Sequence, residues 1–149
     1  MGDLLQPWHI LVLTSVFGIF FVIPAIFYIL TLQGALKKCS EASRTLEPGM
    51  IWLLLVPFVN LIWHFFVVMG IANSLGNEFK MRNWVATEPQ PGQSIGLAMC
   101  ICAACSIIPF LGVIAGVASL VLWIIYWAKI GEYSRLLSGT QASVGPVGI

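Results

Sequence analysis

Cysteines in one apolar stretch of the chain are the first residues whose types could carry chemistry. Cys100, Cys102 and Cys105 lie within six consecutive residues, and clustered thiolates can hold zinc or an iron–sulfur cluster. In a helix, however, Cys102 and Cys105 share a face, while Cys100 points about 160° away from Cys102. Buried cysteine also packs as a small apolar side chain. We therefore predict a packing role and no metal site, and we expect reduced thiols without a disulfide if Cys39 is cytoplasmic.

The two histidines are the remaining candidate ligands. His9 begins the first apolar stretch, and His64 follows Pro57 by seven residues, with Asn60 on its helical face. If the chain turns at Pro57, both histidines lie at a similar depth, where a shared haem or metal is geometrically permitted. The alternative is that each is hydrogen-bonded separately near a membrane surface. Two histidines without a spacing pattern do not establish a cofactor site, so we predict no cofactor. If one were bound, His9 and His64 would be the candidate ligands.

Groups for acid–base or nucleophilic catalysis are sparse. No Asp or Glu lies inside an apolar stretch, where an acid would mark a functional site by default. Nucleophile-elbow, phosphate-binding and metalloprotease patterns are absent from the sequence. We therefore predict that the protein is not an enzyme. The formal net charge of +1 comes without a basic patch, so we also predict no nucleic-acid partner.

The elements that position these residues are long and apolar. Hydrophobic residues make up 59% of the 149 residues and charged residues 9%, against about 25% charged in soluble domains. Three stretches contain no Asp, Glu, Lys or Arg, and each exceeds the ~20 residues that cross a bilayer. They run between Asp3 and Lys37, between Glu47 and Glu78, and between Glu88 and Lys129. We predict an all-α integral membrane protein with a single transmembrane domain over residues 1–149.

The first and third stretches have one simple interpretation each. No Lys or Arg precedes the first stretch, which is longer than the apolar core of a signal peptide, so we expect one tilted span over about residues 8–36. As a single helix, the third stretch would be about 60 Å long, twice the ~30 Å hydrocarbon core. It must therefore turn, and Pro109 to Gly112 carries turn residues. We predict a spanning hairpin over about residues 94–137.

Pro57 interrupts the second stretch, either as a kink in one span or as a turn. A kink would place three Lys and Arg residues on one side and four on the other, whereas a turn places all seven on one side, as the positive-inside rule favours. The arm over residues 50–57 would be only about 12 Å long, so the hairpin over about 50–79 would be re-entrant and shielded by protein. We predict this hairpin, with the N-terminus outside and loops 37–49 and 80–94 and the C-terminus cytoplasmic. Residues 138–149 are expected to form a flexible tail.

The two hairpin regions look like distant copies of each other. Each contains Pro-Gly, then Pro-Phe, then a tryptophan followed by a serine eleven residues later. The tryptophan–serine pairs are Trp63 with Ser74, and Trp123 with Ser134. The spacings before the turn differ, so the repeat is weak.

Small side chains at intervals of three and four predict where helices pack closely in the bilayer. One stripe consists of Gly112, Gly116 and Ser119, and the facing stripe of Gly96, Cys100 and Ala104. The stripes predict a tight pair of helices within the chain, and the alternative is that one of them mediates self-association.

Two segments resemble a family of bacterial multi-pass membrane proteins without an assigned activity. The first is EPGMIWLLLVPFVNLIWHFFVVMGIANSLGNEF, with Pro-Gly, then Trp, then Pro-Phe-x-Asn-Leu, and the second is IIPFLGVIAGVASLVLWIIYWAKIGEYSRLL. Together the segments cover roughly residues 46–137. The resemblance implies a bacterial inner (cytoplasmic) membrane location and assigns no site residues.

The function class follows from small size, stripes of small residues and the absence of buried charge. We expect a non-catalytic membrane interaction protein, either self-assembling or an accessory subunit of a larger complex, whose partners are the lipid bilayer and itself or other membrane proteins. The alternative is one protomer of an oligomeric channel or transporter, with Asn60, His64 and Asn73 as polar lining. A haem-bearing electron-transfer subunit is a third reading that depends on the two histidines.

Overall fold

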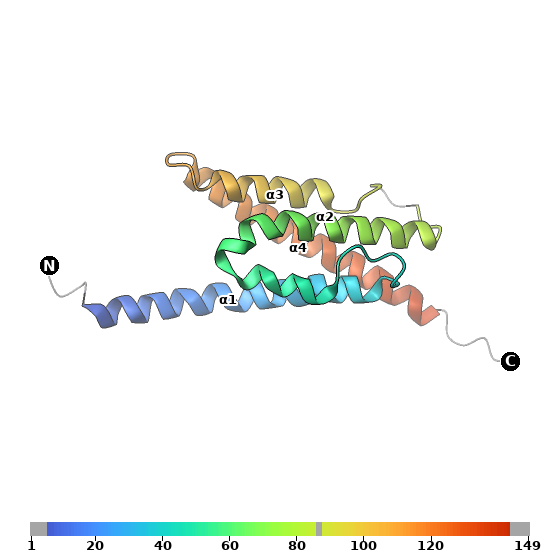
Figure 1. Cartoon of the computed structure of the whole chain (residues 1–149), viewed down its shortest axis with the longest axis horizontal. Helices are drawn as coiled ribbons and strands as arrows, with labels where there is room; N and C mark the ends of the chain where they lie inside the picture. Colours follow the sequence, from blue (N-terminus) through green and yellow to red (C-terminus); the bar gives the residue numbers. More distant parts are fainter. Residues whose placement is uncertain (1–5, 86–87, 144–149) are drawn as a thin grey trace.

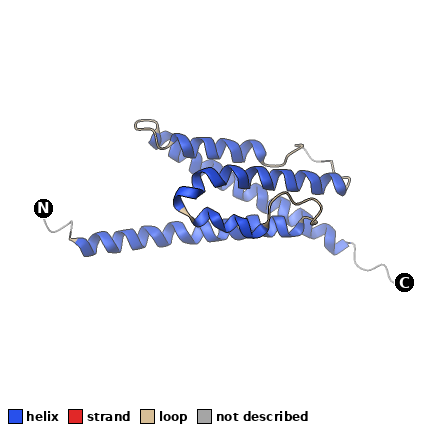
Figure 2. Ribbon diagram, viewed as in Figure 1, coloured by secondary structure: helices blue, strands red, loops and turns tan. Residues whose placement is uncertain are grey.

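Four α-helices and one 3₁₀ helix make up the fold. The structure is a computed structural model that describes residues 6–85 and 88–143. The elements in chain order are α1 (Pro7–Lys38), η2 (Pro48–Leu55), α2 (Pro57–Met81), α3 (Gln93–Cys105) and α4 (Gly112–Ser143). Figure 2 shows only helices and loops among these residues. The prediction of an all-α membrane fold is confirmed.

Three of the helices are long and apolar enough to cross a membrane. These segments are Pro7–Lys38, Phe58–Met81 and Gly112–Gly139. A flexible tail was expected over residues 138–149, but residues 138–143 continue α4. Residues 144–149 lie outside the described part of the chain. Helix α4 continues because its last turns are tied to the bundle: Leu137 is fully buried, and its carbonyl accepts a hydrogen bond of 3.5 Å from Arg82.

The chain reverses direction within each of the two predicted helical hairpins, η2–α2 and α3–α4 (Figure 1). The first reversal lies at Val56, which has extended backbone angles (φ −85°, ψ 111°) between η2 and Pro57. A residue before proline is pushed out of the helical region, and proline is favoured in the first turn of a helix. Pro57 therefore starts a new helix after a turn and does not kink a continuous one.

The second reversal joins Cys105 to Gly112 through residues 106–111. Phe110 within it has φ 72°, a left-handed conformation that is uncommon for a residue with a side chain. A Cβ atom at Gly112 would lie 2.5 Å from the Ser106 carbonyl oxygen. Glycine at this position lets the first turn of α4 start directly against the end of α3.

The buried core occupies the half of the bundle that contains the interhelical loops. Fully buried side chains come from the second half of α1, from residues 67–79 of α2 and from residues 126–137 of α4. The first half of α1 extends past both hairpin turns (Figure 1), and no residue of its most apolar 18-residue window is buried. The molecule is thus closed at one end and open at the other.

A buried carboxylate fastens the closed end. Glu78 is 4% exposed and accepts hydrogen bonds from the Ser40 backbone N–H (2.8 Å), the Ser40 hydroxyl (2.8 Å) and the Ser43 hydroxyl (2.5 Å). Arg82 donates a fourth bond of 2.8 Å and forms an ion pair with it. A buried carboxylate is stable only when donors surround it in this way. The loop after α1 is therefore held against the end of α2.

The helices approach most closely at Gly96 of α3. A Cβ atom there would clash with Val68 of α2 and would lie 2.9 Å from the Tyr126 ring of α4. Cys100, one turn later, is buried, and the Ser119 hydroxyl of α4 donates to the Met99 carbonyl at 3.2 Å. The stripe predicted to face α4 thus packs against α2 as well.

Candidate functional site

Both hairpins start from the same level of the bundle. The Thr45 hydroxyl, in the loop before η2, donates to the Gly70 carbonyl at 2.9 Å. The Gln93 amide, at the start of α3, contacts the Met69 sulfur at 3.4 Å. The two polar connections therefore reach adjacent residues of α2, and the lengths of the hairpins can be compared from this common level.

The first hairpin is the shorter one. Its outgoing arm, η2, has 8 residues and spans about 16 Å at 2.0 Å per residue. Helix α3 has 13 residues and spans about 20 Å at 1.5 Å per residue, before the turn adds further length. In Figure 1 the turn between η2 and α2 stops short of the turn between α3 and α4, and α1 continues beyond both.

A half-open cavity of about 490 Å³ lies where the first hairpin ends. Its walls come from five elements: α1 and α4 contribute most of the apolar side chains, η2 and α3 contribute the other apolar ones, and α2 contributes Asn60 and His64. The wall residues with large or aromatic side chains are Phe20, Phe21, Ile29, Leu54, Met99, Leu120 and Trp123. The cavity is therefore mainly apolar and faces the part of α1 that has no partner.

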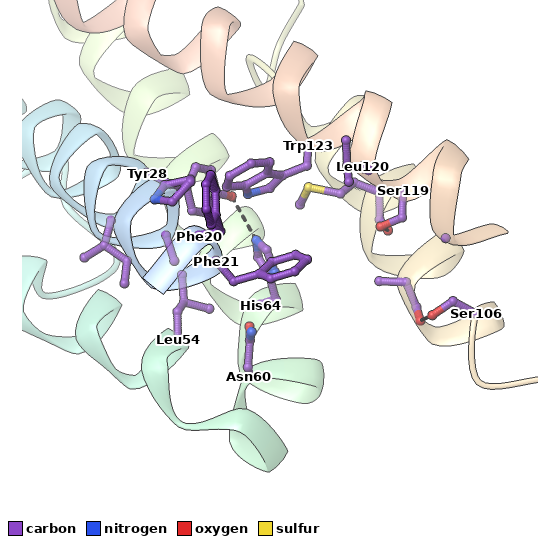
Figure 3. A pocket seen from close by; sticks show the side chains of 16 residues that line it. Phe20, Phe21, Tyr28, Leu54, Asn60, His64, Ser106, Ser119, Leu120 and Trp123 are labelled. Carbon is purple, nitrogen blue, oxygen red and sulfur yellow. Dashed lines mark hydrogen bonds between the residues drawn. The ribbon is translucent and has the colours of Figure 1, made fainter. Parts of the chain in front are cut away.

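Polar side chains from α1 and α2 line one side of this cavity. The Tyr28 hydroxyl and His64 Nε2 are joined by a hydrogen bond of 2.8 Å, and Asn60 lies one helical turn before His64. Figure 3 shows Asn60, His64 and Tyr28 following one another along one side of the cavity, with Trp123 beside Tyr28 and Ser119 farther across. Within the described part of the chain, the Asn60 side-chain amide makes no hydrogen bond.

Aromatic side chains hold Tyr28 in place. Tyr28 is 3% exposed, and its ring centroid lies 5.2 Å from that of Trp123 and 6.1 Å from that of Trp127. The Trp127 indole N–H in turn donates to the Thr31 hydroxyl at 2.9 Å. These contacts between α1 and α4 fix the position from which Tyr28 reaches His64.

The two histidines do not share a site, and the similar depth predicted for them is wrong. His9 lies in the first turn of α1, where it stacks on Trp8 with ring centroids 3.5 Å apart. His64 is bonded to Tyr28, which is 19 residues from His9 on the same helix, or about 28 Å along it. Two axial ligands of one iron or metal must each lie about 2 Å from it. The first hairpin is too short to bring His64 level with the start of α1.

The three residues predicted as a polar lining divide into two groups. Asn60 and His64 both line the cavity. The side-chain oxygen Oδ1 of Asn73 instead accepts a hydrogen bond of 2.7 Å from the Gln90 side-chain amide. Asn73 lies about 20 Å further along α2 than Asn60. Asn73 therefore helps to attach the loop before α3, and the polar side of the cavity consists of Asn60, His64 and Tyr28.

The cysteines occupy separate environments. Cys100 lines a smaller hollow of about 140 Å³ together with Asn60 and His64. Cys39 is buried at the closed end, where burial first, and then the nearby Glu78 carboxylate, raise the pKa of its thiol to about 11. Among residues 6–85 and 88–143, no group of three or more His, Cys, Asp and Glu side chains could hold a metal ion.

Comparison of the chain with protein family models, with curated proteins and with solved structures gives no match. The site is therefore interpreted from its own geometry. Sequence patterns had indicated Asn60 and His64 but neither Tyr28 nor Trp123. The available signal for Tyr28 was a hydroxyl group in the middle of an otherwise apolar span, where a buried polar group needs a partner.

Proposed function

We propose that the protein is a non-catalytic membrane protein that binds other membrane proteins through the open end of its bundle. The observation that carries this proposal is the exposure of α1 toward its start: no residue in the most apolar 18-residue window of this helix is buried. A partner helix would cover this surface, which the chain's own hairpins are too short to reach. The partner is either a second copy or another subunit of a larger complex.

Small side chains in the first half of α1 suit close helix packing. Thr14 and Gly18 lie one turn apart, and a Cβ atom at Gly18 would meet nothing within 4 Å. Small residues four apart let two helix backbones approach each other in a bilayer, where dispersion contacts replace the hydrophobic effect. We place the partner helix against this face.

The membrane orientation is part of the proposal. Polar loops meet α2 near Gly70, and the first hairpin extends only about 16–20 Å from that level, against a hydrocarbon core of ~30 Å. This length supports a re-entrant first hairpin. The concentration of Lys and Arg at the loop end supports a cytoplasmic position for that end, with the start of α1 outside and the chain in a bacterial inner membrane.

Substitution of two glycines on the same helix tests the partner surface. Gly18→Leu places bulk on the proposed face, while Gly34→Leu is the matched control, because a Cβ atom at Gly34 also meets nothing within 4 Å. Native mass spectrometry of gently extracted protein should show a complex for the wild-type chain and for Gly34→Leu, and a much smaller complexed fraction for Gly18→Leu. A complex that contains only copies of this chain would identify self-assembly. A complex that contains other polypeptides would identify an accessory subunit. A monomeric wild-type protein would refute the proposal.

An oligomeric channel or transporter is the second candidate, and the cavity beside Asn60 and His64 is the observation that favours it. Its walls are mainly apolar, which argues for a ligand site over an aqueous path. Solute flux across liposomes that contain the purified protein would establish transport. An absence of flux would favour the proposed role in binding other membrane proteins.

A further inference from the structure

The cavity beside Asn60 and His64 lies far from the charged end of the bundle. His64 precedes Glu78 by 14 residues on α2, or about 21 Å along the helix. With the loop end at the cytoplasmic surface, as proposed above, this distance places the polar side of the cavity inside the hydrocarbon region. Water does not satisfy polar groups at that depth, and each unsatisfied group is costly.

The cavity presents hydrogen-bond donors that the chain itself does not use. The Asn60 amide carries two N–H donors and has no partner among the described residues. When the Tyr28 hydroxyl donates to His64 Nε2, the ring proton of the neutral imidazole is on Nδ1, which can donate it to a ligand. A group that accepts hydrogen bonds, such as a carbonyl oxygen, fits beside these side chains.

The charge and shape of the cavity lining restrict the chemical class of the ligand further. The residues that line the cavity include no Asp, Glu, Lys or Arg, so nothing there would compensate a phosphate or an ammonium group in a medium of low polarity. Phe20, Phe21 and Trp123 present aromatic rings, which favour contact with a flat ring. A volume of about 490 Å³ lies within the roughly 300–1,000 Å³ typical of small-molecule sites.

An apolar tail of a bound ligand could extend directly out of the cavity. Phe20 and Phe21 are 74% and 67% exposed, so no other part of this chain covers the outer side of the wall that α1 provides. A ligand could keep its ring against the polar side chains while its tail extends between α1 and the α3–α4 hairpin into the bilayer. Such a molecule would enter sideways from the membrane.

We propose that this cavity binds a neutral, membrane-dissolved quinone, with a ring carbonyl accepting hydrogen bonds from Asn60 and His64 and the apolar tail in the lipid. Tyr28 acts as a positioning residue, because its hydroxyl fixes the His64 ring. The competing occupant is a lipid acyl chain, which would use the apolar walls but none of the donors.

Binding of decylubiquinone to the full chain in nanodiscs tests this proposal. Saturable binding should be weakened about tenfold or more by Asn60→Leu and by His64→Leu, as expected when a buried carbonyl loses a donor. Ser138→Ala is the control, because it also removes a hydroxyl group from a membrane helix but lies outside the cavity. Its affinity should equal that of the wild-type chain.

Two further measurements keep the test decisive if a polar-to-leucine variant fails to fold. Gly116→Leu adds bulk where a Cβ atom would meet only the Ser106 Cβ at 3.9 Å, so it should fill the cavity and abolish binding while all donors remain. The infrared carbonyl stretch of bound decylubiquinone should lie at lower frequency than in empty nanodiscs, because hydrogen bonds weaken the C=O bond. Unsaturable binding, an unshifted stretch, or equal affinity for Asn60→Leu, His64→Leu and the wild-type chain would refute quinone binding and leave an acyl chain as the occupant.

Discussion

The two hairpins begin at the same level of α2 but end at different distances from it. The η2–α2 hairpin reaches its turn through 8 residues of 3₁₀ helix, while α3 contributes 13 residues of α-helix before its turn. This difference in arm length leaves the cavity beyond the first turn, bounded by α1 on one side and α3–α4 on the other. One hairpin thus completes the packing, and the other leaves a cavity beside its end.

Their attachments at the loop end also differ, and the largest predicted effect tests this difference. Glu78, which is 4% exposed, fastens the first hairpin through four hydrogen bonds, whereas Glu88 fastens the second through a half-buried pair with Lys129 at 2.9 Å. Glu78→Gln should destabilise the fold by about 3–5 kcal/mol, because buried donors lose a charged acceptor. Glu88→Gln should cost less than about 1 kcal/mol. Unfolding in mixed detergent and sodium dodecyl sulfate measures both, and similar values would remove the proposed contrast.

The two turns should differ in their tolerance of charge. Phe58 is 93% exposed at the first turn, and Phe110 is fully exposed at the second. If the first turn stops inside the hydrocarbon core, Phe58→Arg should cost about 2.5–3.5 kcal/mol of insertion free energy. Phe110→Arg should cost clearly less, because its turn lies closer to the outer surface. A membrane-insertion assay of the two variants gives the comparison, and an equal penalty would argue that both turns reach the same depth.

A glycine in the outgoing arm of each hairpin should respond differently to a methyl group. Gly96→Ala places a Cβ against Val68 and Tyr126, and overpacking of this kind costs about 1–3 kcal/mol. At Gly49 in the first hairpin, a Cβ atom meets nothing within 4 Å, so Gly49→Ala should be neutral or stabilising by up to about 1 kcal/mol. The same detergent unfolding experiment applies. A neutral Gly96→Ala would show that the three-helix contact is looser than described.

The smallest predicted effect concerns pH and the attachment of the second hairpin. The hydrogen bond from Lys129, and then the one from the Gly92 N–H, lower the pKa of Glu88. Since the folded pKa lies below the unfolded value of about 4.3, the pair stabilises the fold above that pH and its contribution is lost as pH falls through the lowered pKa. The stability difference between wild type and Glu88→Gln should therefore shrink from about pH 5 to about pH 3. A difference that stays constant would exclude this pair as its source.

Much of the fold could be predicted because local rules determine it. The apolar stretches exceed the bilayer in length, and proline with its preceding residue favours a turn at Val56–Pro57. The tertiary contacts of the site could not be predicted, since they depend on how α1 lies against α2. Tyr28 and His64 are 36 residues apart, and no spacing pattern encodes their meeting.

Other failures of prediction have the same physical origin. Glu78 stands at a polar helix end in the sequence, and its burial results from the loop around Ser40 and Ser43 folding over it. A turn at Pro57 gives His9 and His64 a similar depth only if the first hairpin extends as far along the bundle as the start of α1. The distance along α1 from His9 to Tyr28 shows that it does not.

The claim that the first hairpin returns α2 to the side of the preceding loop is tested most directly by thiol labelling. Single cysteines would be introduced as Gln6→Cys, Glu41→Cys and Met81→Cys after replacement of the four native cysteines. In intact cells, a membrane-impermeant maleimide should label Gln6→Cys from outside and should reach Glu41→Cys and Met81→Cys only after permeabilisation. Labelling of Met81→Cys in intact cells, with Glu41→Cys still protected, would show that the second stretch crosses the membrane and would contradict the hairpin.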